Sequence, residues 1–164
     1  MRNPQPIPDP TGRLPVAKFT DRTRTVLLLA HESAVELGNA AISPAHLILG
    51  ILREGDGVAA AVLTNRGVPF AALEGELREQ LSGLERPVAE KSEVTWGADS
   101  VSVLEQAVAE AREMSHYYLG TEHVLLGLLR DSGSMTGRVL ARYGMRWEDA
   151  HAEVVKLLHG PWPN

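Results

Sequence analysis

The sequence AISPAHLILGILREGDG, residues 41–57, recurs in altered form as YLGTEHVLLGLLRDSGS, residues 118–134. Aligning His46 with His123 sets an offset of 77 residues (123 − 46 = 77), and this offset places residues 19–81 on residues 96–158 without a gap. Identical positions are spread along both segments: Val26/Val103, Leu27/Leu104, Ala30/Ala107, Leu49/Leu126, Gly50/Gly127, Leu63/Leu140 and Gly67/Gly144. A register kept over this length indicates two copies of one structural unit.

Each copy is expected to form four helices. Thr20, followed by Asp21, is a suitable N-cap for the first helix, and Ser43 followed by Pro44 marks the start of the second. Apolar residues recur at helical spacing after these caps, and glycines end the segments. The helices are predicted at about 21–37, 44–53, 58–66, 69–81, 98–115, 121–130, 134–143 and 146–158.

The predicted fold class is all-α, with two tandem, pseudo-symmetric four-helix repeats that contain eight helices in total. No segment alternates β-branched and polar residues with a period of two, so no sheet is expected.

Three short segments lie outside the two repeats. Residues 1–18 hold five of the ten prolines and are expected to form a flexible Pro-rich tail. The polar residues 82–95 are expected to link repeat 1 (19–81) to repeat 2 (96–158), and residues 159–164 form a second tail. The first tail has no apolar signal-peptide core, and no stretch approaches the roughly 20 apolar residues of a membrane span. We therefore expect a cytoplasmic protein without membrane contact.

The composition excludes several functional classes. The chain has 164 residues, of which 44% are hydrophobic and 23% are charged, as in ordinary globular proteins. It has no cysteine, which excludes disulfides, thiolate nucleophiles and cysteine-containing zinc sites. The net charge of −5 disfavours binding to nucleic acid. We expect neither a cofactor nor a metal site.

The repeated motifs resemble those of a known family. The strings FTDRTRTVLLLAHESA (19–34), ISPAHLILGILREGDGVAAAVL (42–63) and LGTEHVLLGLLRDSG (119–133) are similar to the double-repeat N-terminal domain of bacterial Clp/Hsp100 unfoldases of the ClpC and ClpA type. In that family the domain precedes two ATPase modules and receives substrates and adaptor proteins. The resemblance implies a non-catalytic protein- and peptide-binding module of the Clp proteolytic system, with a Clp unfoldase, adaptor proteins or substrate peptides as partners.

No enzymatic activity is expected. A Walker A loop needs a Gly-Lys pair to hold phosphates, and this sequence contains none. A Gly-x-Ser-x-Gly nucleophile motif is also absent from the sequence. Two alternatives stay open: a decoy that sequesters Clp-directed cyclic-peptide antibiotics or adaptors, and the N-terminal fragment of a full-length Clp ATPase. The Pro-rich start and the ending HGPWPN favour a stand-alone protein.

The resemblance also implies candidate residues for phosphoarginine binding. In ClpC-type relatives, a Glu of the Gly-Thr-Glu-His segment recognises the guanidinium group, and a Thr at the start of the repeat's first helix helps to hold the phosphate. If the Glu and the helix start of the same repeat form one phosphoarginine pocket, neither repeat has a complete pocket. Repeat 1 has Ala45 at the Glu position, and repeat 2 has Asp99 where a basic residue is expected. Helix capping is the alternative role of the retained Glu. The matching residues are Glu122, Thr121, Thr20 and Arg22.

Two further pairs of equivalent residues have open roles. Phe19 and Trp96 begin the two repeats, and the resemblance implies an apolar surface near them for adaptors or, in actinobacterial members, cyclic-peptide antibiotics. Core packing is the alternative. His46 and His123 lie at equivalent helix starts, without further ligands at metal-binding spacing except Glu122, so we expect both to be hydrogen-bonded structural residues.

Overall fold

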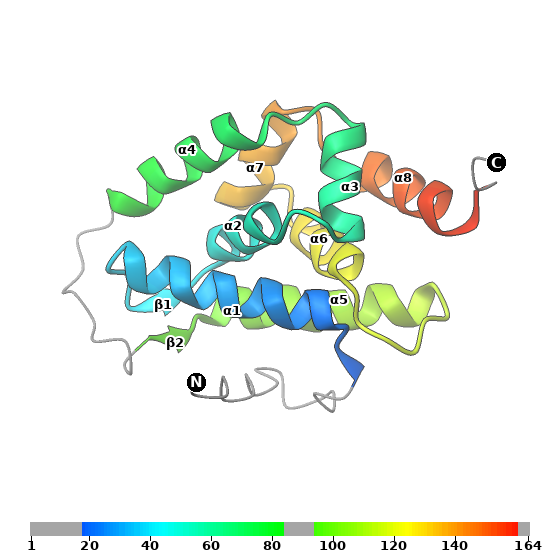
Figure 1. The fold of residues 1–164 in the computed structure, drawn as a ribbon, viewed down its shortest axis with the longest axis horizontal. Helices are drawn as coiled ribbons and strands as arrows, with labels where there is room; N and C mark the ends of the chain where they lie inside the picture. Colours follow the sequence, from blue (N-terminus) through cyan, green and yellow to red (C-terminus); the bar gives the residue numbers. More distant parts are fainter. Residues whose placement is uncertain (1–17, 84–93, 161–164) are drawn as a thin grey trace.

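The computed structural model describes residues 18–83 and 94–160. The predicted tail at residues 1–17, most of the predicted linker (84–93) and residues 161–164 lie outside the described residues. The described chain contains, in order, α1 (Asp21–Glu36), β1 (Ala41–Ile42), α2 (Pro44–Glu54), α3 (Val58–Asn65), α4 (Phe70–Ser82), β2 (Thr95–Trp96), α5 (Ala98–Glu113), α6 (Thr121–Arg130), α7 (Met135–Arg142) and α8 (Trp147–His159). The prediction of two four-helix repeats is confirmed (Figure 1).

Local capping bonds explain where several helices begin. The Thr20 side chain accepts a backbone N–H in the first turn of α1 at 3.1 Å. At the start of α2, His46 Nδ1 accepts the backbone N–H of Ser43 at 2.9 Å. His123 Nδ1 accepts the N–H of Gly120 at the same distance at the start of α6. The equivalent histidines therefore close the first turn of the second helix in each repeat.

The helices α2 and α6 form the centre of the fold. Nearly every residue of both helices is buried, which agrees with sequences that are apolar on all sides. Gly50 lies against α1, where an added Cβ would stand 2.4 Å from the carbonyl oxygen of Val26. Gly127 lies against α5 in the same way, 2.6 Å from the carbonyl oxygen of Val103. The repeated glycines thus allow two close helix pairs, α1 with α2 and α5 with α6.

Among residues 18–83 and 94–160, no helix combines the length and the apolar character that crossing a bilayer requires.

The expectation that no sheet forms is wrong at one place. The strands β1 and β2 form a parallel pair in which Ala41 lies opposite Thr95 and Ile42 opposite Trp96. Strands of two residues are too short to produce an alternating sequence pattern. Thr95, predicted as the last linker residue, therefore belongs to a strand.

A second contact of the same kind joins the other ends of the repeats. Phe19 forms a parallel bridge with Leu119, and the Thr20 N–H donates to the Leu119 carbonyl at 3.1 Å. Phe19 and Leu119 are the 77-residue counterparts of Trp96 and Ile42. Each repeat therefore begins against the other repeat, and the two units are interlocked through their first residues.

Candidate functional site

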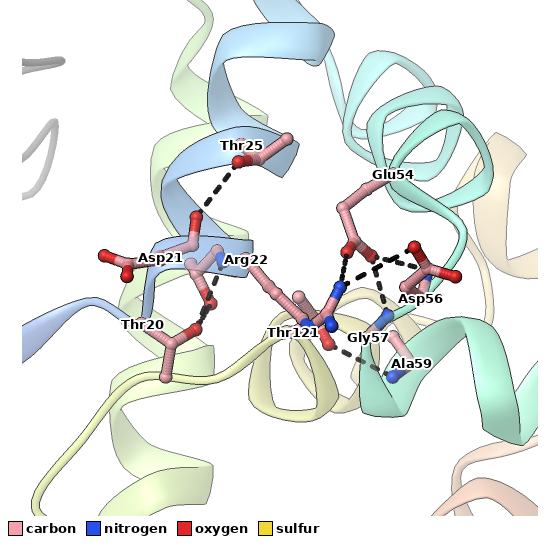
Figure 2. A network of polar contacts seen from close by, with 10 residues as sticks. Thr20, Asp21, Arg22, Thr25, Glu54, Asp56, Gly57, Ala59 and Thr121 are labelled. Carbon is pink, nitrogen blue, oxygen red and sulfur yellow. Dashed lines mark hydrogen bonds and ion pairs between the residues drawn. The ribbon is translucent and has the colours of Figure 1, made fainter.

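The starts of α1, α3 and α6 meet in one polar site (Figure 2). The Thr20 N–H and the Thr23 hydroxyl both donate to the carbonyl oxygen of Leu119, at 3.1 and 2.9 Å. Thr121, at the start of α6, accepts the backbone N–H of Ala59 from α3 at 3.1 Å. Residues from both repeats therefore build this site.

Arg22 extends across this polar site. Its guanidinium Nη1 donates to Glu54 Oε1 at 2.8 Å and lies 3.9 Å from Asp56 Oδ2 (Figure 2). Thr121 lies near the same carboxylate, because a Cβ added at Gly57 would stand 2.7 Å from Thr121 Oγ1 and 3.0 Å from Glu54 Oε2. Glu54 Oε2 accepts the N–H groups of Asp56 and Gly57 at 3.2 and 2.8 Å. The hydrogen bond from Arg22 to Glu54 raises the pKa of the arginine. We call this cluster the Arg22 site (Thr20, Arg22, Glu54 and Thr121).

The structure corrects the expected pairing of the candidate residues within each repeat. Thr20 and Arg22 of repeat 1 lie beside Thr121 of repeat 2, whereas Ala45 and Asp99 line a separate groove. The cause is the reciprocal contact described above, which sets the start of each repeat's first helix against the start of the other repeat's second helix.

Glu122 is enclosed rather than presented to solvent. The residue is 3% exposed, and its carboxylate lies over Gly120, where an added Cβ would stand 2.3 Å from Oε1. Burial raises the pKa of Glu122, and this effect outweighs the opposing effect of the nearby Tyr118. The candidate residues Thr20, Arg22 and Thr121 are thus together, and the Glu122 carboxylate is covered.

A groove of about 690 Å³ occupies the position pseudo-symmetric to the Arg22 site. The start of α2, one side of α5 and the segment that leads from α6 into α7 form its walls. Its lining includes Pro44, Ala45, Asp99, Val103, Asp131 and Thr136. At the 77-residue offset these are the counterparts of Thr121, Glu122, Arg22, Val26, Glu54 and Ala59. We call this cavity the inter-repeat groove.

The two aromatic candidates have different environments. Phe19 is 5% exposed and belongs to the hydrophobic core, so the core alternative holds for this residue. Trp96 is half-buried and packs against the same core. A surface at Trp96 for adaptors or cyclic peptides stays a prediction.

The two capping histidines have separate partners and serve the structural role predicted for them. His46 Nε2 lies 2.9 Å from Asn39 Oδ1, and His123 Nε2 lies 2.9 Å from His116 Nδ1. Burial lowers the pKa of both His46 and His123 to about 4.

His116, Glu122 and His123 place three potential metal-ligand atoms within 4.8 Å of one another. No sequence pattern indicated that His116 would join this cluster. His123 Nδ1 accepts the Gly120 N–H, so the ring proton is on Nε2 and points to His116. A metal ion on Nε2 would require an imidazolate ring or the loss of the capping bond. The cluster therefore fits a hydrogen-bonded helix start better than a metal centre.

Two equivalent loops contribute to the Arg22 site and to the groove. No sequence motif marked residues 54–57 or residues 131–134 as part of a site. In the structure Glu54 holds a cation, and Asp131 lines the groove at the equivalent position. The 77-residue alignment contained this signal, because it places Asp99 at the position of Arg22.

Comparison with known proteins identifies the family. Residues 18–156 match the Clp repeat (R) N-terminal domain. The chain belongs to the Clp repeat N-terminal domain family. This Clp repeat domain is 38% identical over 141 residues to the ClpC/MecB negative regulator of genetic competence from Bacillus subtilis, a match that covers 86% of this chain and 17% of that protein. The chain thus spans less than a fifth of that curated relative.

Solved structures share the fold of this Clp repeat domain. The N-domain of ClpV from Vibrio cholerae gives a TM-score of 0.74 at 15% identity and covers 100% of this chain and 97% of that one. A ClpV N-domain in complex with a VipB peptide gives a TM-score of 0.72 at 16% identity, with coverage of 100% and 99%. At sequence identities of 15% and 16%, the similarity to these structures shows a shared fold.

Proposed function

We propose that this Clp repeat domain is a non-catalytic module that binds peptides or adaptor proteins for the Clp proteolytic system. The inter-repeat groove is the observation that carries the proposal. It is a concave surface of about 690 Å³ whose apolar lining includes Val103, Leu128 and Met135, with polar groups from three helices beside them. The complex of a ClpV N-domain with a VipB peptide supports this assignment, because that domain has the same fold.

Calorimetric titration with short synthetic peptides tests this function. The peptides share one flexible sequence and differ only at a central residue, which is arginine, phosphoarginine, citrulline or glutamate. Ser102 is exposed in the groove, so Ser102→Trp should fill it and weaken binding by about tenfold or more. The matched control is Thr25→Trp, because Thr25 is the exposed counterpart of Ser102 beside the Arg22 site.

Two outcomes would contradict the proposal. One is the absence of saturable binding to every peptide and to the cognate unfoldase and adaptors. The other is a peptide affinity that Ser102→Trp and Thr25→Trp change equally, since this would place binding outside the groove.

A finer proposal assigns phosphoarginine binding to the Arg22 site and Glu122. Arg22 supplies a cation beside the starts of α3 and α6, which is favourable for a phosphate group. Binding requires the phosphate to replace Glu54 at Arg22 and the ligand guanidinium to reach the Glu122 carboxylate, which is buried. Arg22→Gln should then abolish phosphoarginine-peptide binding, and unchanged affinity in this variant would contradict the assignment.

A further inference from the structure

We infer that the inter-repeat groove selects polypeptide segments that carry an unmodified arginine or lysine, whose cationic group takes the place that Arg22 occupies in the pseudo-symmetric site. This inference rests on the proposed peptide-binding function and specifies the chemistry of the bound residue. It follows from a comparison of the two halves of one molecule.

The Arg22 site and the inter-repeat groove are built from equivalent helices and loops. They differ in the sign of the charge at one position, which is Arg22 in the first and Asp99 in the second. In the Arg22 site, the guanidinium of Arg22 lies 2.8 Å from the carboxylate of Glu54. The counterparts of these residues are Asp99 and Asp131, and both line the groove. A carboxylate therefore stands at the arginine position, while the acidic partner is retained.

Asp131 retains the local contacts of Glu54. Its Oδ1 accepts the N–H groups of Gly133 and Ser134 at 3.2 and 3.1 Å, as Glu54 accepts two N–H groups in the preceding repeat. Within residues 18–83 and 94–160, neither Asp99 nor Asp131 takes part in an ion pair. The carboxylates of the groove thus have no cationic partner in the described part of the chain.

Arg130 also lines the groove, but its charge is already paired. Its guanidinium contacts Glu110, lies 3.5 Å from Glu113 and sits 3.9 Å above the ring of Trp147. Glu110 is 1% exposed and also accepts the Trp147 indole N–H at 3.2 Å. The contacts with the buried Glu110, with Glu113 and with the Trp147 ring hold Arg130 in place and pair its charge, so Asp99 and Asp131 determine the charge that the groove offers to a ligand.

The partial positive charges of the helix starts at the groove do not outweigh the preference of the two aspartates for a cationic ligand. The N-termini of α2 and α7 each carry about +0.5 of an elementary charge, whereas the two aspartates carry full negative charges. The starts of α6 and α3 lie around Arg22 in the same way, and a guanidinium group is accommodated there (Figure 2). The framework therefore accepts a cation between two helix starts.

The groove also suits the rest of a basic side chain. A guanidinium group can form paired hydrogen bonds with a carboxylate, and an ammonium group can contact it as a point charge. The methylene stems of arginine and lysine pack on apolar surface, which Val103, Leu128 and Met135 provide.

The test compares the arginine peptide with the citrulline peptide, because citrulline has nearly the same shape and no charge. The wild-type chain should bind the arginine peptide about tenfold more tightly at low salt. Asp99→Asn and Asp131→Asn should remove this preference. In Asp131→Asn the side-chain amide keeps an oxygen acceptor for the loop, and both positions are exposed, so thermal unfolding should show unchanged folding.

A charge exchange between the repeats provides the second variant set. Asp99→Arg places a cation opposite Asp131, as Arg22 stands opposite Glu54, and should block the groove. Arg22→Asp should create a second cation site next to Glu54. In the double variant R22D/D99R, binding of the arginine peptide should become sensitive to Thr25→Trp and insensitive to Ser102→Trp.

Three results would overturn the inference. Equal, Ser102→Trp-sensitive affinities for arginine and citrulline peptides would leave the peptide-binding function intact but refute the charge preference. Tighter binding of the phosphoarginine peptide that is lost on Asp99→Asn would assign the groove to the modified residue. Failure of all peptides to bind would refute the peptide-binding function itself.

Discussion

The backbone N–H of Thr20 in repeat 1 donates to the carbonyl oxygen of Leu119 in repeat 2 at 3.1 Å. The fully buried Thr23 hydroxyl donates to the same oxygen at 2.9 Å. Thr23→Val retains the shape of the side chain and removes this donor. We expect the free energy of unfolding to fall by about 1 to 1.5 kcal/mol, measured by denaturant titration.

Thr25→Val is the control for the Thr23 prediction. The exposed Thr25 hydroxyl donates to the Asp21 carbonyl of its own helix at 3.1 Å (Figure 2), so its loss should change stability by less than about 0.5 kcal/mol. Equal destabilisation in both variants would indicate that the contact between the repeats contributes nothing specific.

The close packing of α1 with α2 and of α5 with α6 predicts that alanine destabilises the fold at the two contact glycines and stabilises it at a glycine with open space around it. Gly50→Ala and Gly127→Ala place a Cβ 2.4 and 2.6 Å from backbone oxygens, which forces the paired helices apart. Each should lower the free energy of unfolding by about 2 kcal/mol or more. Gly75, in α4, has nothing within 4 Å of an added Cβ, so Gly75→Ala should raise it by up to about 1 kcal/mol. Destabilisation by all three changes to the same extent would contradict this packing.

The ends of α1 and α5 predict a stabilising substitution. Gly38 has φ +69°, whereas its counterpart Ser115 adopts φ +60°, in the left-handed region that disfavours a side chain. Ser115 is exposed, so Ser115→Gly should raise the free energy of unfolding by about 0.5 to 1 kcal/mol without loss of contacts. Gly38→Ser should lower it by a similar amount. Thermal unfolding measures both, and a lower melting temperature for Ser115→Gly would contradict the prediction.

The capping histidines predict a loss of stability in acid. In the folded chain the pKa values of His46 and His123 are about 4, against 6.5 in the absence of the fold. Between these values the unfolded chain binds protons that the folded chain excludes. The free energy of unfolding should therefore decrease as the pH falls from 6.5 to 4, by up to roughly 1.4 kcal/mol per histidine and pH unit. Burial raises the pKa of Glu122, which acts in the opposite direction just above the ordinary range of a glutamate.

His46→Gln tests this acid sensitivity. A glutamine at this position can accept the Ser43 N–H and donate to Asn39, but it does not titrate. The slope of stability against pH should decrease in this variant and stay unchanged in the control variant His31→Gln, which lies outside both caps. An unaltered slope in His46→Gln would refute the linkage.

The sequence was sufficient to predict the repeats and the ends of the helices, because caps such as Thr20 and Ser43 and glycines such as Gly67 act over a few residues. It did not predict the pairing of Phe19 with Leu119 or the strand at Thr95. These contacts join segments far apart in the chain through backbone atoms, and backbone hydrogen bonds leave no residue-specific pattern.

The candidate site was predicted in part for a related reason. The family resemblance implied Thr20, Arg22 and Thr121 as candidate residues, and the structure places them in one site. The sequence could not show that Glu122 is buried, since that depends on side-chain packing. Nor could it show that the groove contains Asp99 and Asp131, which lie in different helix and loop segments.

NMR titration of the arginine peptide into the wild-type chain tests whether the inter-repeat groove binds a cationic residue. Backbone amide shifts should concentrate at groove residues such as Ser102, Asp131 and Thr136, with little change at the counterparts Thr25, Glu54 and Ala59. Shifts concentrated at the Arg22 site, or no shifts at saturating peptide, would contradict this prediction.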